Sequence, residues 1–241
     1  MKLLFILIAL SITPSTFAKS RNSTFDFSEA KSFLAKNLNL FEGKTIYCSC
    51  NVIGKKVDLD SCGYKIQKDK KRAERLEWEH VVPAEAFGNS FTEWREGDPR
   101  CQKHGKKFKG RKCAGKNSEF QKMEGDLYNL FPEIGELNGL RSNYSMAKLG
   151  GESSKFGGCK VKLENRKFEP MDGAKGVVAR TYLNFENRYP NRGVVSDKNR
   201  KLFEAWDKLY PVSELECRRW KKLEKVMGYT HHFANRCTKL D

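Results

Sequence analysis

Apolar residues recur about every 3.6 positions in several parts of the chain, a spacing typical of helices with one buried face. The stripe of Phe27, Ala30, Leu34 and Leu38 predicts a helix from Phe27 to Leu40. A second helix is predicted from Ala174 to Tyr189, where Pro190 stops it. Its inner face carries Val178, Tyr182 and Phe185.

Two further helices are predicted near the end of the chain from their first residues. Ser196 can cap a helix that ends before Pro211, and Ser213 with Glu216 forms a capping-box pattern for a last helix that ends near Gly228. The first of the two is expected to bury Leu202, Phe203, Trp206 and Leu209.

Strand patterns are fewer and come earlier. β-Branched and aromatic residues concentrate from Lys44 to Cys50 and from Leu76 to Val82. We therefore expect an α+β fold, rich in helices, as a single domain around one small sheet.

The first eighteen residues differ from the rest. Lys2 precedes an apolar run from Leu3 to Ile12, and a small residue, Ala18, closes the segment. A spanning helix is the alternative, but it needs roughly 20 apolar residues. The pattern favours a secretory signal peptide over residues 1–18, cleaved after Ala18, ahead of a domain over residues 19–241. No later run is long enough to suggest a membrane anchor.

Eight cysteines follow that segment, at positions 48, 50, 62, 101, 113, 159, 217 and 237. An even number in an exported chain indicates up to four disulfides. A zinc site is the alternative, although Cys48 and Cys50 are separated by one residue where structural zinc sites have two to four. The pairing stays open, except that proximity suggests Cys101 with Cys113.

The net positive charge of the chain suggests a class of binding partner. The chain has 46 Lys and Arg residues against 30 Asp and Glu, which fits a polyanion such as nucleic acid or, alternatively, a surface that only favours solubility. Eight Lys or Arg residues and no acid lie between Arg100 and Asn117. This basic loop is either a solvated surface loop or a contact for phosphates.

The sharpest chemical feature is Glu79 followed by His80. An imidazole can accept a proton near neutral pH, and a carboxylate is a hard oxygen ligand for Mg²⁺. The two side chains would point to opposite faces of a regular strand, so a shared site requires the strand to end or bend, for which Pro83 offers a reason. The alternative is a buried histidine beside a surface glutamate.

A second feature is a helix expected from Ser118, capped by Ser118 with Gln121 and ended by Pro132. Asn129 on this helix could offer its amide oxygen to a metal, or serve as a local hydrogen-bonding residue. Gly125, one turn earlier, would leave that surface open for a partner.

Taken in order, these segments resemble the bacterial endonuclease I family, the non-specific nucleases of the ββα-metal (His-Me finger) superfamily. The resemblance covers nearly all of the chain after the signal segment. The segments that carry it are Glu77-Trp78-Glu79-His80-Val81-Val82-Pro83-Ala84, Phe120–Leu130, Asn138-Gly139-Leu140-Arg141-Ser142-Asn143-Tyr144, Lys175–Tyr182, Phe203-Glu204-Ala205-Trp206 and Tyr210-Pro211-Val212.

The resemblance implies a strand-turn-strand-helix site that cuts DNA and RNA with little sequence preference. His80 would be the general base, Glu79 and Asn129 would hold one hydrated Mg²⁺, and Arg100 would contact the scissile phosphate. The products would carry 5′-phosphate ends. One departure is His231-His232-Phe233, where the family often has Asn-Pro-Phe.

Two other functions compete with this interpretation. A basic exported protein that binds nucleic acid without cutting it fits the charge and the cysteines but leaves Glu79, His80 and Asn129 unexplained. A zinc hydrolase fits less well, since His80 has no second histidine four residues away. The chain is expected in the periplasm or outside the cell, as a monomer without a membrane or an obligate protein partner.

Overall fold

The computed structural model describes residues 25–153 and 155–237. The predicted signal peptide, its cleavage after Ala18 and the start of the domain at residue 19 lie outside the described residues. No described helix is long and apolar enough to cross a membrane.

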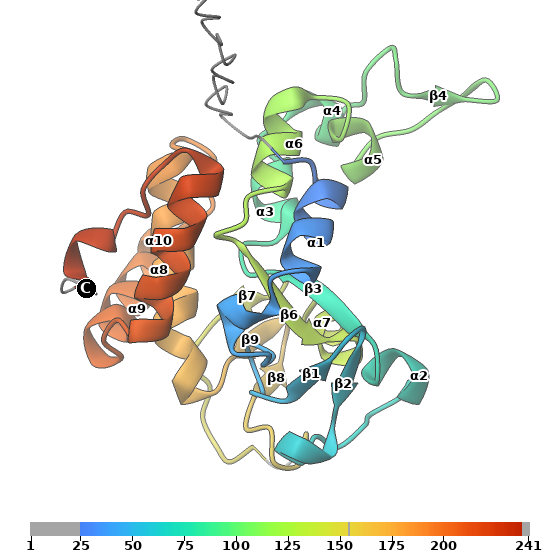
Figure 1. Cartoon of the computed structure of the whole chain (residues 1–241). Coiled ribbons are helices and arrows are strands. Elements are labelled where there is room, and N and C mark those ends of the chain that lie inside the picture. The colour runs from blue at the N-terminus through green and yellow to red at the C-terminus, as the bar shows by residue number, and fades with distance from the viewer. Residues whose placement is uncertain (1–24, 154, 238–241) are drawn as a thin grey trace, which may run out of the picture.

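Helices dominate the described residues (Figure 1). They are α1 (Phe27–Ala35), α2 (Lys70–Ala73), α3 (Ala84–Gly88), α4 (Thr92–Arg95), α5 (Arg111–Ala114), α6 (Ser118–Glu124), α7 (Gly135–Arg141), α8 (Asp172–Arg188), α9 (Asp197–Leu209) and α10 (Glu214–Met227). Three short 3-10 helices accompany them, η1 (Leu38–Phe41), η2 (Asp60–Cys62) and η3 (Ala234–Arg236).

The strands are short. They are β1 (Asn51–Ile53), β2 (Lys56–Asp58), β3 (Leu76–His80), β4 (Gln102–Lys103), β5 (Lys106–Lys107), β6 (Leu130–Ile134), β7 (Ser145–Met146), β8 (Lys162–Glu164) and β9 (Lys167–Glu169). In the described ranges they pair as β1–β2, β3–β6, β4–β5 and β7–β9–β8. The mixed, helix-rich class is confirmed, but the expectation of one small sheet is wrong, because the strands of the described residues form four separate small sheets.

The three long helices near the end of the chain confirm their predictions. Ser196 caps α9, and Ser213 with Glu216 forms a capping box at the start of α10. Figure 1 shows α8, α9 and α10 as one block of orange and red helices. Leu209 was expected to be buried but is 68% exposed, because α9 ends at this residue.

The helix predicted from Phe27 to Leu40 is interrupted. A capping box of Asp26 with Glu29 starts α1, which ends at Ala35. The Asn37 side chain then donates to the Phe33 carbonyl at 2.8 Å, a local bond that competes with helix propagation. The chain continues instead as η1.

The prediction of a strand from Lys44 to Cys50 is wrong, because the middle of this segment forms a turn. The Ser49 amide donates to the Thr45 carbonyl at 3.1 Å, and the Cys50 amide donates to Thr45 Oγ1 at 3.0 Å. These bonds close a turn, so the strand begins only at Asn51.

The helix expected from Ser118 is shorter than predicted. Its cap is Asn117, and it ends at Glu124, so Asn129 and Pro132 lie outside it. The Asp126 carboxylate accepts hydrogen bonds from the Tyr128 amide at 2.9 Å and the Tyr229 hydroxyl at 2.5 Å. These bonds fold the following residues into a turn that leads to β6.

Gly125 does allow a close approach, but by the chain's own backbone. A Cβ at this position would lie 2.0 Å from the Phe25 carbonyl oxygen. The expectation that Gly125 leaves room for a partner is therefore wrong, since the segment before α1 fills the space.

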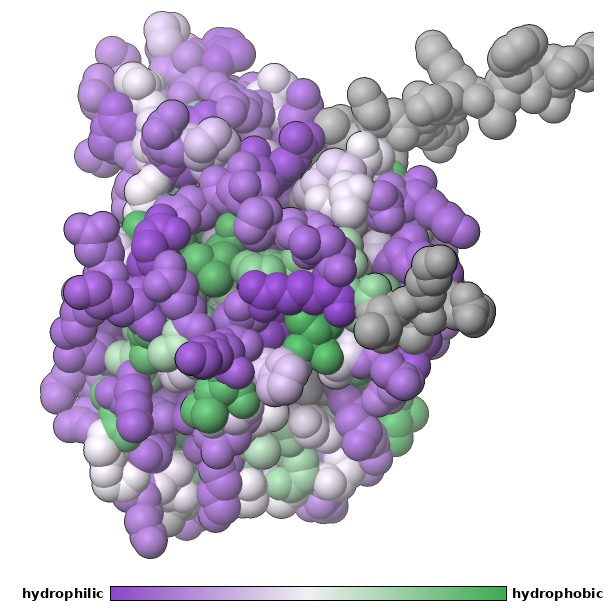
Figure 2. Space-filling model, turned by 90° about the vertical axis from the view of Figure 1, so that its left-hand side faces the viewer, coloured by the Kyte–Doolittle hydropathy of each residue, from purple (hydrophilic) through white to green (hydrophobic). Residues whose placement is uncertain are grey.

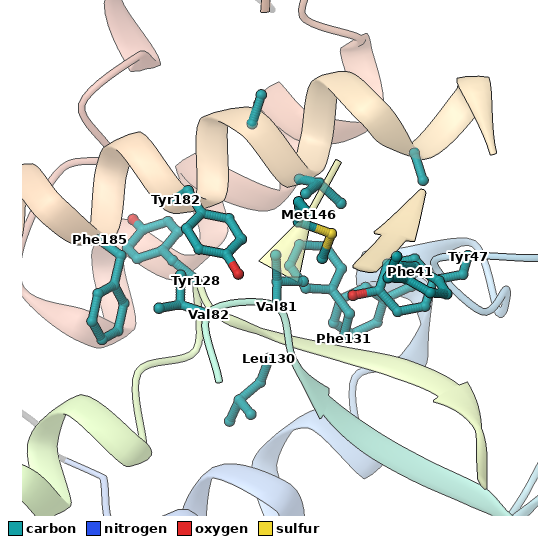
Figure 3. Close-up of a cluster of buried hydrophobic side chains, with 14 of the residues drawn as sticks. Phe41, Tyr47, Val81, Val82, Tyr128, Leu130, Phe131, Met146, Tyr182 and Phe185 are labelled. Carbon is teal, nitrogen blue, oxygen red and sulfur yellow. The ribbon is translucent and has the colours of Figure 1, made fainter. Parts of the chain in front are cut away.

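The buried side chains form one connected cluster. Figure 3 shows Tyr182 of α8 beside Val81 and Val82, which follow β3, with Leu130 and Phe131 of β6 below them. The face of the molecule in Figure 2 is mostly hydrophilic, with scattered apolar residues. The end of β3 is thus fixed from both sides by the core.

All eight cysteines form disulfides. The pairs are Cys48–Cys159, Cys50–Cys62, Cys101–Cys113 and Cys217–Cys237. This confirms the disulfide prediction and the suggested pairing of Cys101 with Cys113. The zinc alternative for Cys48 and Cys50 is wrong, because both sulfurs are taken.

Candidate active site

An open cavity of about 710 Å³ lies along one edge of β3. The side chains of β3, the first turns of α1, the start of α5 and the end of α7 line it. Because β3 pairs antiparallel with β6, and α7 follows β6 directly, the cavity lies beside a unit of two strands and a helix. Glu79 and His80 both reach this cavity.

His80 is the last residue of β3 and is held in one orientation. Its Nε2 lies 2.8 Å from the Glu124 carbonyl oxygen. A carbonyl only accepts hydrogen bonds, so Nε2 must carry the proton and Nδ1 keeps its lone pair. Burial, and next the charge of Arg111, lower the pKa of His80 to about 3. The ring is therefore a neutral acceptor at neutral pH.

Glu79 is a buried carboxylate, only 2% exposed. Its Oε1 accepts from the Tyr47 hydroxyl at 2.8 Å and lies 2.9 Å from an Arg141 nitrogen. Oε2 takes part in neither contact. Burial raises the pKa of Glu79, while the Arg141 charge acts in the opposite direction.

Arg141 connects Glu79 to the backbone on either side of the strand end. It donates to the His80 carbonyl at 2.8 Å and to the Val81 carbonyl at 2.7 Å. One buried guanidinium thus fixes both the carboxylate and the chain that carries the imidazole.

The structure places Asn129 beside the strand end but outside the lining of the cavity. Its Oδ1 accepts from the Val82 amide at 2.7 Å, and its Nδ2 donates to the Val82 carbonyl at 3.0 Å. The side chain therefore fastens the backbone that follows His80. Its role as a metal ligand stays a prediction.

Arg100 also lies outside the cavity lining. Its guanidinium is exposed and bonded to Asp98, with Nε 2.7 Å from Oδ1. The structure does not bring Arg100 together with His80, and its contact with a phosphate stays a prediction.

A different arginine, Arg111, lines the cavity. Its Nε donates to Glu124 Oε1 at 2.5 Å, and its guanidinium lies 5.2 Å from the centre of the Phe27 ring. That ring in turn lies 4.7 Å from the ring of His80. Sequence reasoning missed Arg111 because it is one of eight similar cations in the basic loop.

Asn138 of α7 is the second residue that was missed. Its Nδ2 donates to Glu77 Oε2 at 3.0 Å, so the remaining polar atom of the amide is its oxygen, a possible metal ligand. Asn138 lines the cavity together with Glu79. It belongs to a segment that carried the family resemblance, and that segment was the available signal.

The far end of the cavity holds two further arginines around Glu77. Arg72 donates to both Glu77 oxygens, at 3.0 and 2.9 Å, and Arg75 donates to Oε1. Lys31 and Arg111 stand at the other end. Cations at both ends of an open cavity suit a chain of phosphates.

The oxygen donors fit a magnesium ion. Mg²⁺ takes one or two carboxylates, keeps several waters and prefers hard oxygen ligands, and Glu79 and Asn138 supply a carboxylate and an amide oxygen on the same cavity. Among the residues that the structure describes, no group of three His, Cys, Asp or Glu could hold a metal.

The comparisons with known proteins all match nucleases. A family model described as Endonuclease I matches residues 22–237. A "Periplasmic deoxyribonuclease" of Aeromonas hydrophila is 40% identical over 220 residues, 86% of this chain and 87% of that protein. An "Extracellular deoxyribonuclease" of the same species is 41% identical over 199 residues, 80% of each chain. "Endonuclease-1" of Buchnera aphidicola is 40% identical over 190 residues, 76% of this chain and 70% of that protein.

Proposed function

The chain belongs to the endonuclease I family, and from this membership we propose that it is an exported nuclease that hydrolyses phosphodiester bonds of DNA and RNA. The names of its relatives, periplasmic and extracellular deoxyribonuclease, support both the chemistry and the export. Four disulfides suit an oxidising compartment, and the pattern of residues 1–18 suits a signal peptide. The family is generally metal-dependent.

One observation carries the chemistry, which is the fixed tautomer of His80. With Nε2 bonded to the Glu124 carbonyl, Nδ1 is the atom that can take a proton from an attacking water. General base catalysis of this kind contributes typically 10²–10⁴-fold. Since burial keeps the ring neutral, His80 stays in the accepting form.

Glu79 and Asn138 would hold the magnesium ion. Asn129, the ligand predicted from the sequence, could join them only through the second lone pair of Oδ1, because the Val82 amide occupies the first. When bound, Mg²⁺ would stabilise the charge that develops on the phosphate and on the leaving 3′ oxygen. Departure of that oxygen leaves a 5′-phosphate end.

Arg111 would contact the scissile phosphate, since it lines the same cavity as His80 and is held by Glu124 and Phe27. We propose that β3, β6 and α7 form the ββα-metal unit, with a long excursion of the chain in place of a turn between the strands. Phosphates are the same along any sequence, so low sequence preference is the expected consequence.

The test is cleavage by the oxidised protein without its first eighteen residues. Plasmid DNA and a structured RNA are incubated with EDTA and then with restored Mg²⁺, and the new ends are labelled to identify the phosphate. His80→Ala should lose cleavage, whereas His232→Ala, at an exposed histidine, should keep it. Tight DNA binding without cleavage in Mg²⁺ would instead support the non-cutting binding protein.

A further inference from the structure

Tyr47 lies in the turn that precedes β1, and its side chain is fully buried. Its ring packs against the ring of Phe168 of β9, with 4.7 Å between the ring centres. Its amide donates to Glu133 Oε2 at 2.7 Å, and the next residue, Cys48, is bonded to Cys159. The ring and the backbone of Tyr47 are therefore both held in place.

The Tyr47 hydroxyl contacts the carboxylate of Glu79. It donates to Oε1 at 2.8 Å, and an Arg141 nitrogen lies 2.9 Å from the same oxygen. Figure 3 shows the hydroxyl directed toward the chain at Val81, just after β3. In the part of the chain that the structure describes, Oε2 takes part in no hydrogen bond or ion pair. Two donors thus share one oxygen and leave the other open.

The open oxygen reaches the cavity. Among the described residues, the fully buried side-chain nitrogens and oxygens without a hydrogen bond are the Nε atoms of Arg141 and Arg219. Oε2 of Glu79 is not one of them, so the small exposed part of this residue includes Oε2. Because Glu79 lines the cavity, a ligand that enters the cavity can meet this atom.

The hydroxyl holds the carboxylate without adding charge. Arg141 is shared, since it also donates to the His80 and Val81 carbonyls. A second cation on Glu79 would repel a divalent metal, whereas a neutral O–H fixes one oxygen and keeps the negative charge available. Carboxylates that bind metals are commonly held by hydrogen bonds from residues outside the ligand set.

We propose that Tyr47 is a positioning residue of the metal site, which holds Oε1 of Glu79 so that Oε2 is presented to Mg²⁺ in the cavity. The inference rests on the proposed function and adds to it a residue that is not itself a ligand. Tyr47 is not part of the cavity lining, so its effect must pass through Glu79. Loss of such an outer contact typically lowers metal affinity 10–100-fold.

The experiment compares Tyr47→Phe with Tyr64→Phe, which removes the same group elsewhere in the core. The Tyr64 hydroxyl donates to Glu136 Oε2 at 3.0 Å, both residues are buried, and neither lines the cavity. In Tyr47→Phe, Glu79 keeps its contact with Arg141, so the variant should fold, which circular dichroism and urea unfolding will verify. Binding of Mg²⁺ is measured by calorimetric titration without DNA, and binding of Mn²⁺ by electron paramagnetic resonance of the free ion.

Tyr47→Phe should bind both ions about 10–100-fold more weakly, and Tyr64→Phe should bind them like the unmodified protein. Cleavage of DNA by Tyr47→Phe should require more Mg²⁺ in the same proportion and recover at saturating Mg²⁺. Equal metal affinity in the two variants would overturn the proposal. So would a fall in kcat that saturating Mg²⁺ does not restore, because the hydroxyl would then act on something other than the metal.

A second substitution at the same position keeps the donor. Tyr47→4-aminophenylalanine replaces the hydroxyl by an amino group that can still donate to Oε1, and it should bind Mg²⁺ nearly as tightly as the unmodified protein. This variant also tests the proposal if Tyr47→Phe does not fold. Weak metal binding by the folded amino variant would overturn the proposal.

The two proposals fail separately. Absence of cleavage by the unmodified protein with Mg²⁺ would overturn the nuclease function, and the titrations would still decide whether Tyr47 supports the metal site. Normal cleavage with unchanged metal affinity in Tyr47→Phe would overturn the Tyr47 proposal alone.

Discussion

Removal of the Cys101–Cys113 disulfide should lower the stability of the protein and also loosen Arg111 in the cavity, and the two effects can be measured separately. The bridge closes a loop of sequence separation 12, and loop-closure entropy for that length corresponds to about 3 kcal/mol at 25 °C. Ordinary domains have stabilities of about 5–15 kcal/mol. We expect C101S/C113S to be destabilised but still folded at low temperature.

The chain offers a matched control in Cys50–Cys62, whose separation is also 12. C50S/C62S should therefore lose the same free energy of unfolding, about 3 kcal/mol. Neither Cys50 nor Cys62 lines the cavity. Stability effects should match in the two variants, and only an effect on the cavity should distinguish them.

The difference is expected in activity, because Arg111 starts the helix that contains Cys113. Loss of one group that stabilises transition-state charge costs about 10²–10³-fold in kcat, so a loosened Arg111 should lower cleavage by up to that factor. The assay is kcat/KM on duplex DNA at 15 °C, with urea unfolding and circular dichroism on the same samples. Equal activity in the two variants would refute the link between this disulfide and the cavity.

Three further predictions concern single residues. Arg111→Ala should lower kcat by about 10²–10³-fold and Arg100→Ala by much less; the opposite order of initial rates would return the phosphate contact to Arg100. Calorimetric titration should show weaker Mg²⁺ binding in Asn138→Ala and little change in a folded Asn129→Ala, whereas weakening only in the latter would make Asn129 the ligand. Burial lowers the pKa of His231 to about 2, so below pH 6.5 the unfolded chain binds a proton that the folded chain does not, and stability falls as the pH falls. Between pH 7 and pH 5 the wild-type free energy of unfolding should decline by about 2 kcal/mol more than that of His231→Phe; equal declines in urea titrations would contradict this.

The parts of the fold that could be predicted are those set by neighbours in the sequence. Ser196 caps α9 through a bond to the amide of Asn199, and Ser213 exchanges bonds with Glu216. Each of these partners lies three residues away, so the sequence pattern alone predicts the hydrogen bond that the structure shows.

The elements that were predicted wrongly depend on side-chain bonds that strand or helix propensity does not describe. Lys44 to Cys50 has strand composition, but bonds to Thr45 close a turn there, and Cys48 is bonded to Cys159, 111 residues further on. Asn129 was expected on a helix, but it follows a turn in which Asp126 is bonded to Tyr229. Nothing near Cys48 or Asp126 in the sequence identifies these distant partners.

The residues of the candidate site also fall into those that the sequence could predict and those that it could not. Glu79 and His80 are adjacent in the chain, so their chemistry was visible as a pair. Arg111 and Asn138 are far from this pair in the sequence, and the folded chain brings both to the lining of the cavity. The sequence shows both residues, but it does not show that they lie in the same cavity as Glu79 and His80.

Glu124 holds the two sides of the cavity by different parts of one residue, its carbonyl for His80 and its carboxylate for Arg111. A mutation at this position replaces the carboxylate but keeps the carbonyl, since every amino acid has one. Natural variation at position 124 can therefore alter the grip on a phosphate while the proton on His80 stays on the same nitrogen. Substitutions at position 124 can therefore change the affinity for a phosphate while His80 keeps the tautomer that a general base requires.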